Sequence, residues 1–225
     1  MTDRMIYHAS EPCGADSFPK TKAYTHVSGV VRVALLSFLT FIATPLVGQF
    51  IVRQVNLAYL CRRAGVIVQG RVASVRYEPL PGYEHIQTVR VMLKVERMIR
   101  GPEVRHYTFR QWVVPVRSGH GKYQSYQAGD DLLLFLPSPS ALGLSSPIGH
   151  EQGKFHIVRD AQGREYIANE FANGGIFNGV AREARSGGLS LSASQLEIAR
   201  TERGRVALEP FVSLVKSLAA LSRIQ

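Results

Sequence analysis

The chain has 225 residues, of which 45% are hydrophobic and 20% charged, and 27 Lys and Arg against 17 Asp and Glu give it a formal net charge of +10. This apolar fraction excludes a wholly disordered chain, and two cysteines are too few for a disulfide scaffold or a cysteine-based zinc site. The basic balance favours anionic partners: nucleic acid for a cytosolic protein, and lipid headgroups or envelope polyanions for an exported one.

An uncharged stretch of the sequence, 33–52, follows a basic flank. The flank, the apolar centre and the later Pro45 and Gly48 resemble a secretory signal, and an uncharged stretch of this length also suffices to span a bilayer. We therefore expect export, with 33–52 either a cleaved signal peptide or an anchor in the inner membrane; a buried core helix is the third interpretation. Residues 1–32 show no periodicity, and we expect no fold there. They are either a short cytosolic tail or the result of a start codon assigned too far upstream.

Residues 54–180 have the pattern of a β domain that begins with a short helix. Asn56 is placed to cap a helix over Leu57–Arg63, and alternating apolar residues separated by Gly- and Pro-rich turns then predict strands. The expected strands are Val66–Tyr77, Gln87–Arg97, Val104–Val114, Leu132–Leu136 and a hairpin of Lys154–Arg159 with Arg164–Asn169. Short strands in this number predict a mainly β fold, a small OB-like barrel that is closed or nearly closed, because a meander otherwise leaves exposed edges. The residues expected in its core are Val89, Val91, Leu93, Val95, Leu133, Phe135 and Phe155.

Residues 186–225 read as a linker followed by helices. Ser194 is predicted to cap a helix from Gln195 toward Thr201. Leu208–Ile224 carries apolar residues at helical spacing, which predicts an amphipathic helix that packs on the barrel or on a partner chain; binding to a membrane surface is the other interpretation.

Motifs that carry catalytic chemistry are absent from the sequence. It contains no His-Glu-x-x-His, no Gly-x-Ser-x-Gly and no phosphate-loop pattern, so we expect neither a metal nor a cofactor. Asp130 and Asp131 precede a buried strand, where aspartate commonly serves the turn. Paired carboxylates also serve general acid–base chemistry, and His150, Glu151 and His156 are close enough in sequence to cluster on one hairpin.

Four segments, in this order, resemble an uncharacterised family of exported bacterial proteins. They are Leu60–Val72, Val95–Gly101, Ala128–Leu136 and Gln152–Gly163. The resemblance implies an OB-type barrel, distantly similar to the netrin-like modules of metalloproteinase inhibitors, with no established activity. Those inhibitors chelate a metal through an N-terminal cysteine amine, whereas Gln49 or Phe50 would begin the mature chain here, so that mechanism is not carried over.

These observations predict an exported, non-catalytic binding module that recognises a protein or an anionic envelope component. Its contacts are expected on the barrel face and on the loop Pro115–Gln127. The candidate binding residues are Arg105, Arg110, Trp112, Arg117, Lys122, Tyr123 and Lys154. Single-stranded nucleic acid fits the barrel, the arginines and the aromatic residues, but export argues against it. The alternative is an envelope hydrolase with a site near Asp130, His150 and Glu151.

Overall fold

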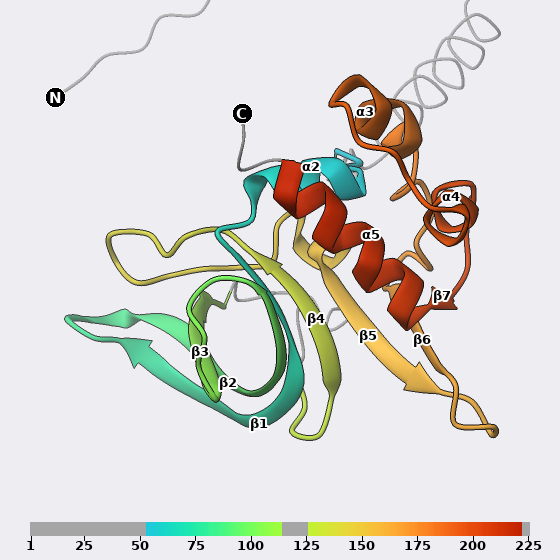
Figure 1. Cartoon of the computed structure of the whole chain (residues 1–225). Coiled ribbons are helices and arrows are strands. Elements are labelled where there is room, and N and C mark those ends of the chain that lie inside the picture. The colour runs from blue at the N-terminus through green and yellow to red at the C-terminus, as the bar shows by residue number, and fades with distance from the viewer. Residues whose placement is uncertain (1–52, 114–125, 222–225) are drawn as a thin grey trace, which may run out of the picture. The chain divides into compact units, whose positions relative to one another are not determined.

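The computed structural model describes residues 53–113 and 126–221, in which a curled sheet carries helices on one side (Figure 1). The helices are α2 (Leu57–Arg63), the 3-10 turn η1 (His150–Gly153), α3 (Val180–Ser186), α4 (Ala193–Ala199) and α5 (Leu208–Leu221). The strands are β1 (Val66–Leu80), β2 (Tyr83–Arg100), β3 (His106–Trp112), β4 (Asp131–Leu136), β5 (Lys154–Arg159), β6 (Glu165–Asn169) and β7 (Val206–Ala207).

The seven described strands form one sheet in the order β3-β2-β1-β4-β5-β6-β7, and every neighbouring pair is antiparallel. The predicted mainly β architecture is therefore confirmed. The sheet is open within the described residues, because its two outer strands, β3 and β7, do not pair with each other. The expected barrel closure is thus not confirmed by the strand pairing.

The β1–β2 hairpin is longer than predicted. The predicted strand ended at Tyr77, whereas β1 continues through Pro79, which lies opposite Gln87, and the turn itself is Pro81-Gly82. Gly82 has a φ of 80°, a left-handed conformation that glycine adopts without steric cost. A register shift between Val72 and Ser74 marks a bulge, and bulges bend a strand and increase its twist. The hairpin consequently curls, together with β3 and β4 (Figure 1).

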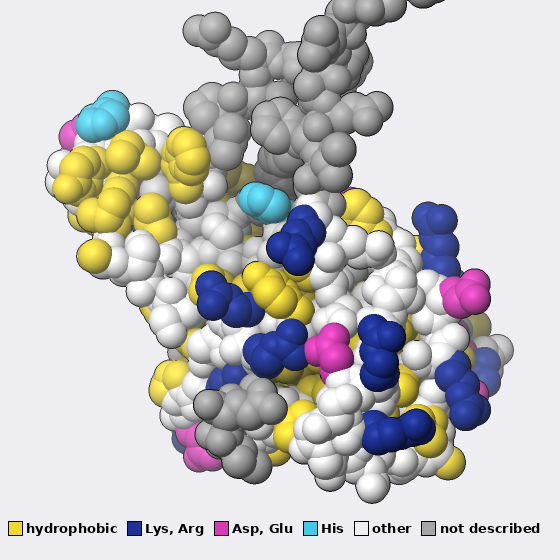
Figure 2. Space-filling model, turned by 90° about the horizontal axis from the view of Figure 1, so that it is seen from above, with side chains coloured by type: hydrophobic (Ala, Val, Ile, Leu, Met, Phe, Trp, Pro, Cys, Tyr) yellow, Lys and Arg dark blue, Asp and Glu magenta, His cyan; other side chains and the backbone are white. Residues whose placement is uncertain are grey.

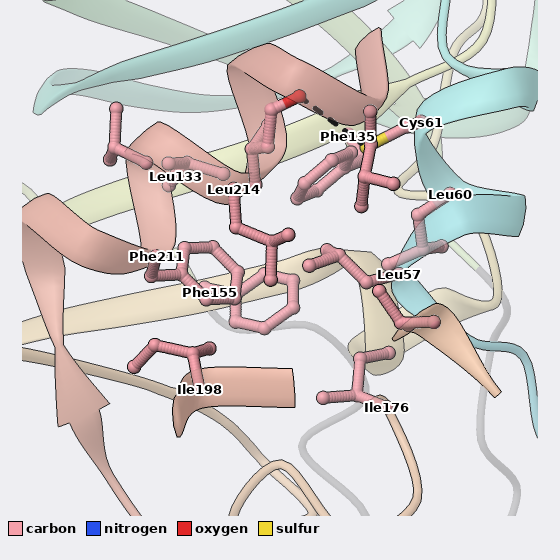
Figure 3. Close-up of a cluster of buried hydrophobic side chains, with 14 of the residues drawn as sticks. Leu57, Leu60, Cys61, Leu133, Phe135, Phe155, Ile176, Ile198, Phe211 and Leu214 are labelled. Atoms are coloured by element: carbon pink, nitrogen blue, oxygen red, sulfur yellow. Dashed lines mark hydrogen bonds between the residues drawn. The ribbon is translucent and has the colours of Figure 1, made fainter. Parts of the chain in front are cut away.

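Strand β4 separates two apolar cores. Leu132, Leu134 and Leu136 face the inside of the curl. Leu133 and Phe135 face the other way, toward the helices (Figure 3). This explains the uninterrupted apolar run of β4, because a strand buried on both faces has no alternation. Six of the seven predicted core residues are buried, and Val95 is partly buried.

The second core lies between the sheet and the helices. Phe211 of α5 lies at its centre, with ring centroids 5.1 Å from Phe155 and 6.1 Å from Phe177 (Figure 3). Helix α2 begins at the predicted cap, since the Asn56 side chain accepts a hydrogen bond from the Tyr59 N–H. The sheet and the C-terminal helices therefore share one core.

The C-terminal helices differ from the prediction in two respects, the residue that caps α4 and the presence of α3. Ser192, and not Ser194, caps α4, because Ser192 and Gln195 form a reciprocal capping box in which each side chain accepts the other's backbone N–H. Helix α3 was not among the predicted elements. The predicted signal or anchor at 33–52 lies outside the described residues, and none of the described helices is long and apolar enough to cross a membrane.

Candidate anion-binding face

Three arginines lie side by side across the convex face of β1, β2 and β3. Arg76 is opposite Arg90 in the β1–β2 ladder, and Arg90 is opposite Arg110 in the β2–β3 ladder. Residues directly opposite in an antiparallel pair project to the same side of the sheet. We call this set the arginine row. Its members alternate with Val75, Val91 and Phe109, which face the inner core.

Glu78 is the one acidic side chain within ion-pair distance of the arginine row among the described residues. Its Oε1 lies 3.0 Å from Nε of Arg90 and 2.5 Å from Nη2 of Arg110. The hydrogen bond from Arg110 lowers the pKa of the Glu78 carboxyl, and the charges of Arg90, Arg110 and Arg76 act in the same direction against a smaller effect of desolvation. One carboxylate thus neutralises one of three guanidinium groups, and the row keeps a surplus of positive charge.

The arginine row works against stability of the sheet. Like charges directly opposite each other on neighbouring strands are destabilising. In addition, the Nε atom of Arg110 is buried and makes no hydrogen bond among the described residues. This alignment of like charges makes the face a candidate site for an anion.

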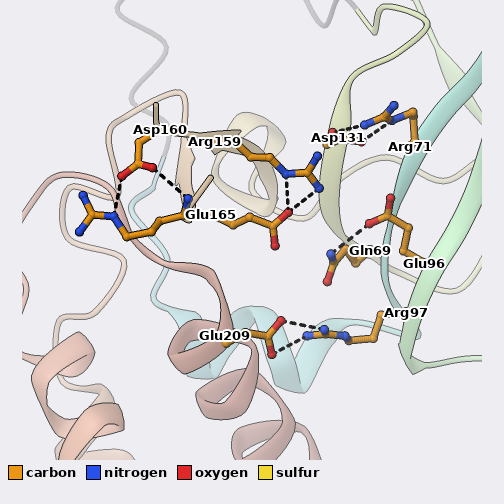
Figure 4. A network of polar contacts seen from close by, with 10 residues as sticks. Gln69, Arg71, Glu96, Arg97, Asp131, Arg159, Asp160, Glu165 and Glu209 are labelled. Atoms are coloured by element: carbon orange, nitrogen blue, oxygen red, sulfur yellow. Dashed lines mark hydrogen bonds and ion pairs between the residues drawn. The ribbon is translucent and has the colours of Figure 1, made fainter. Parts of the chain in front are cut away.

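A second arginine-rich region of the sheet is electrically balanced and provides the contrast. It holds four ion pairs, each 2.7 to 2.8 Å long (Figure 4). The pairs are Arg71–Asp131, Arg97–Glu209, Arg159–Glu165 and Arg164–Asp160. Every arginine there has its own carboxylate, so these eight side chains carry no surplus of positive charge.

The helical side also carries many Lys and Arg side chains (Figure 2). A polar hollow of about 330 Å³ lies there beside α2 and α3, lined in part by Arg53, Tyr59 and Arg62. Arg62 donates to Glu183 at 2.6 Å, and Asn56 donates to the same carboxylate at 2.7 Å. These groups satisfy one another, which makes the hollow a weaker candidate than the arginine row.

Trp112 adds an aromatic surface next to the row. It lies two residues beyond Arg110 on β3, opposite Thr88, and 53% of it is exposed. The free edge of β3 is covered at Arg110, where Ser145 donates its N–H to the Arg110 carbonyl at 2.8 Å. The predicted binding residues Arg110 and Trp112 therefore meet on one face, and the exposed Arg105 immediately precedes β3.

Lys154 does not belong to this face, and its prediction as a surface binding residue is wrong. Its side chain is 5% exposed and its Nζ lies 2.6 Å from Oε2 of Glu151. The Nζ also lies 5.1 Å from the centroid of the Tyr126 ring, whose hydroxyl donates to Gln111 at 3.1 Å. Lys154 lies at the start of β5 opposite Leu134, so the ladder turns it toward the inner core. Burial, with a smaller contribution from Glu151, raises the pKa of Tyr126.

The remaining predicted binding residues, Arg117, Lys122 and Tyr123, lie outside the described residues. The groups of the hydrolase alternative are not brought together. Asp130 precedes β4 and accepts the Gln127 N–H in a turn, while Glu151 precedes β5. Because β4 and β5 are antiparallel, Asp130 and Glu151 adjoin opposite ends of this ladder. The described part of the chain also holds no cluster of His, Cys, Asp and Glu suited to a metal.

Sequence reasoning missed Arg76, Arg90 and Glu78. The signal was present, since Arg76 and Arg90 occupy the polar positions of two alternating strands on either side of a Pro-Gly turn. Locating the turn at Pro81-Gly82 places these two positions near each other, but the bulges decide the register and are not visible in the pattern.

Comparison with known proteins identifies no relative: no family model, no curated protein and no solved structure matches this chain.

Proposed function

We propose that this protein is a non-catalytic module that binds an anionic polymer on the face formed by the arginine row and Trp112. The observation that carries the proposal is the ratio of three aligned arginines to one carboxylate on the outer face of the sheet. Of the two expected partners, a protein or an envelope polyanion, the surplus of like charge favours the polyanion, because it adds a repulsion that only a negatively charged ligand relieves.

The fold we propose for the sheet is an OB-like barrel. Support comes from the order β3-β2-β1-β4-β5, which is the order of the strands of an OB barrel opened between its third and fifth strands. The segment after β4 offers a substitute for the missing pairing, because Leu144 forms a parallel bridge with Arg110 and Ile148 donates its N–H to the Phe135 carbonyl. OB-like barrels bind oligosaccharides and oligonucleotides on the face of the second and third strands, where Arg90, Arg110 and Trp112 lie.

The proposed location is outside the cytoplasm, with 33–52 as the signal or as an anchor in the inner membrane. Support comes from the uncharged composition of that stretch behind a basic flank. An exported polyanion binder would meet acidic polymers of the cell envelope and little nucleic acid.

The test uses the full-length protein and dextran sulfate as a generic polyanion, with neutral dextran as the blank. The chain has a single tryptophan, so its fluorescence reports directly on the proposed face. We expect dextran sulfate to change this fluorescence and the affinity to fall with added salt, since the Debye length shrinks from about 10 Å at 0.1 M to about 3 Å at 1 M.

A matched pair of double variants separates the arginine row from net charge. Arg76→Gln with Arg90→Gln should weaken binding about tenfold, equal to about 1.4 kcal/mol. Arg159→Gln with Arg164→Gln removes the same charge from the balanced network and should change the affinity less than about twofold. Equal losses in both variants, or binding that is insensitive to salt, would show that the row is not the site.

A further inference from the structure

The arginine row also restricts the class of polyanion. Its three members lie on three consecutive strands, and neighbouring strands are about 4.8 Å apart, so the row presents one guanidinium per about 4.8 Å over roughly 10 Å. This repeat is close to the length of one pyranose residue in a linear polysaccharide. A polymer of acidic sugars that crosses the strands would bring a carboxylate within reach of the row.

Glu78 indicates which acidic group the row accepts. One of its carboxylate oxygens bridges Arg90 and Arg110, at 3.0 and 2.5 Å. The fork of a guanidinium matches a carboxylate in shape as well as charge. Arg76 has no ion-pair partner among the described residues and stays open for an external carboxylate.

Trp112 distinguishes a sugar polymer from the other carboxylate polymers and from nucleic acid. Trp112 lies two residues, about 7 Å, along β3 from Arg110 and therefore to one side of the row, so a polymer that reaches both Arg76 and Trp112 crosses the three strands obliquely. An exposed indole offers a flat apolar surface to the C–H face of a pyranose ring. Proteins that bind single-stranded nucleic acid stack successive bases on several aromatic side chains. On this strand the other two large aromatic rings, Tyr107 and Phe109, pack with the inner core.

We propose that the ligand is a linear uronic-acid polysaccharide that crosses β1, β2 and β3 obliquely, with a carboxylate on Arg76 and a sugar ring on Trp112. This inference rests on the proposed function of the same face. It adds that recognition combines charge with stacking, so a strong polyanion without the sugar geometry should bind through charge alone.

The test compares polymers by titration calorimetry with the full-length protein. Polygalacturonate supplies sugar and carboxylate together. Polyglutamate supplies carboxylate without a sugar ring, dextran sulfate supplies charge, and oligo-dT supplies phosphate and bases. We expect polygalacturonate to bind at least about tenfold more tightly than polyglutamate or oligo-dT at equal charge concentration.

Two variants at one position test the stacking. Trp112→Ala should weaken polygalacturonate binding about tenfold and dextran sulfate binding less than about threefold, and Trp112→Phe should restore most of the loss. The inference would be overturned, and the proposed function would stand, if dextran sulfate binding depended on Arg76 and Arg90 while polygalacturonate binding was unchanged in the Trp112 variants. Tighter binding of oligo-dT or polyglutamate than of polygalacturonate would overturn it as well. Failure of every polyanion to bind would overturn both.

Discussion

The buried ion pair Lys154–Glu151 offers a sharp test of how the inner core is built. Lys154→Met keeps most of the length of the side chain but removes its charge. Both carboxylate oxygens of Glu151 are inaccessible to solvent and make no hydrogen bond among the described residues. The variant therefore removes the one ion-pair partner that the described residues provide for this carboxylate. Breaking a buried pair in this way costs about 3–5 kcal/mol. We expect about 3 kcal/mol, the lower end, because one fifth of the Glu151 side chain is still exposed.

Urea unfolding followed by circular dichroism measures the effect. With a slope of about 2 kcal/mol per molar, a loss of about 3 kcal/mol lowers the midpoint by about 1.5 M. Glu151→Gln should also destabilise, since it leaves the Lys154 cation buried. The double variant Lys154→Met/Glu151→Gln should recover at least half of the summed loss, because it removes both charges together.

The control is Lys94→Met, which removes an exposed lysine of β2 and should change the free energy of unfolding by less than about 0.5 kcal/mol. A loss below about 1 kcal/mol in Lys154→Met would contradict the burial of this side chain. A double variant whose loss equals the sum of the two single losses would contradict the pairing.

The remaining predictions concern the packing of Phe211 in the second core, the reactivity of Cys61 and the loss of stability at acidic pH. Phe211→Ala should lower the free energy of unfolding in urea by about 3–5 kcal/mol. The control Lys216→Ala, on the exposed side of α5, should lower it by less than about 0.5 kcal/mol. Similar losses in the two variants would show that Phe211 is not at the centre of the core. Burial raises the pKa of Cys61 to about 12, so in the native protein it should resist a thiol reagent that labels it fully after unfolding, with peptide mapping used to separate it from Cys13; rapid native labelling would refute its burial. Burial alone would raise the pKa of Glu183, but hydrogen bonds from Arg62 and Asn56 outweigh the effect of burial and lower this pKa. The stability that the ionised Glu183 contributes is therefore present above the ordinary carboxyl pKa and is lost as the pH falls through the lowered value. Glu183→Gln should therefore show a flatter loss of unfolding free energy between neutral pH and about pH 3 than the natural protein, and identical pH profiles would refute the assignment.

Local pattern was sufficient for most of the secondary structure. The alternation of β2 and the cap at Asn56 are properties of adjacent residues, and helix α2 and strand β5 have the predicted bounds. The uninterrupted run Leu132–Leu136 correctly indicated a strand buried on both faces. The turn Asp160–Gly163 was also correct, with the Gly163 N–H bonded to the Asp160 carbonyl. Each of these features depends on contacts within a few residues, so the sequence shows them directly.

The candidate site depended on contacts between residues far apart in the chain. Arg76, Arg90 and Arg110 are unremarkable polar positions in three separate strands, and only the bulged register of β1 with β2 and the pairing of β2 with β3 align them. A shift of one residue in either ladder would turn one arginine away from the other two, since side chains alternate with a period of two.

The burial of Lys154 was decided in the same way, against the expectation for its residue type. Lysine at the start of a strand is usually solvent-exposed. Here Glu151, three residues earlier, provides its counter-charge, and the Tyr126 ring from a distant segment provides its cover. The sequence by itself determined which segments are strands and helices and how their apolar faces alternate. The tertiary structure decided which polar side chains meet, because strand order and register arise from pairings across the whole chain that no local pattern encodes.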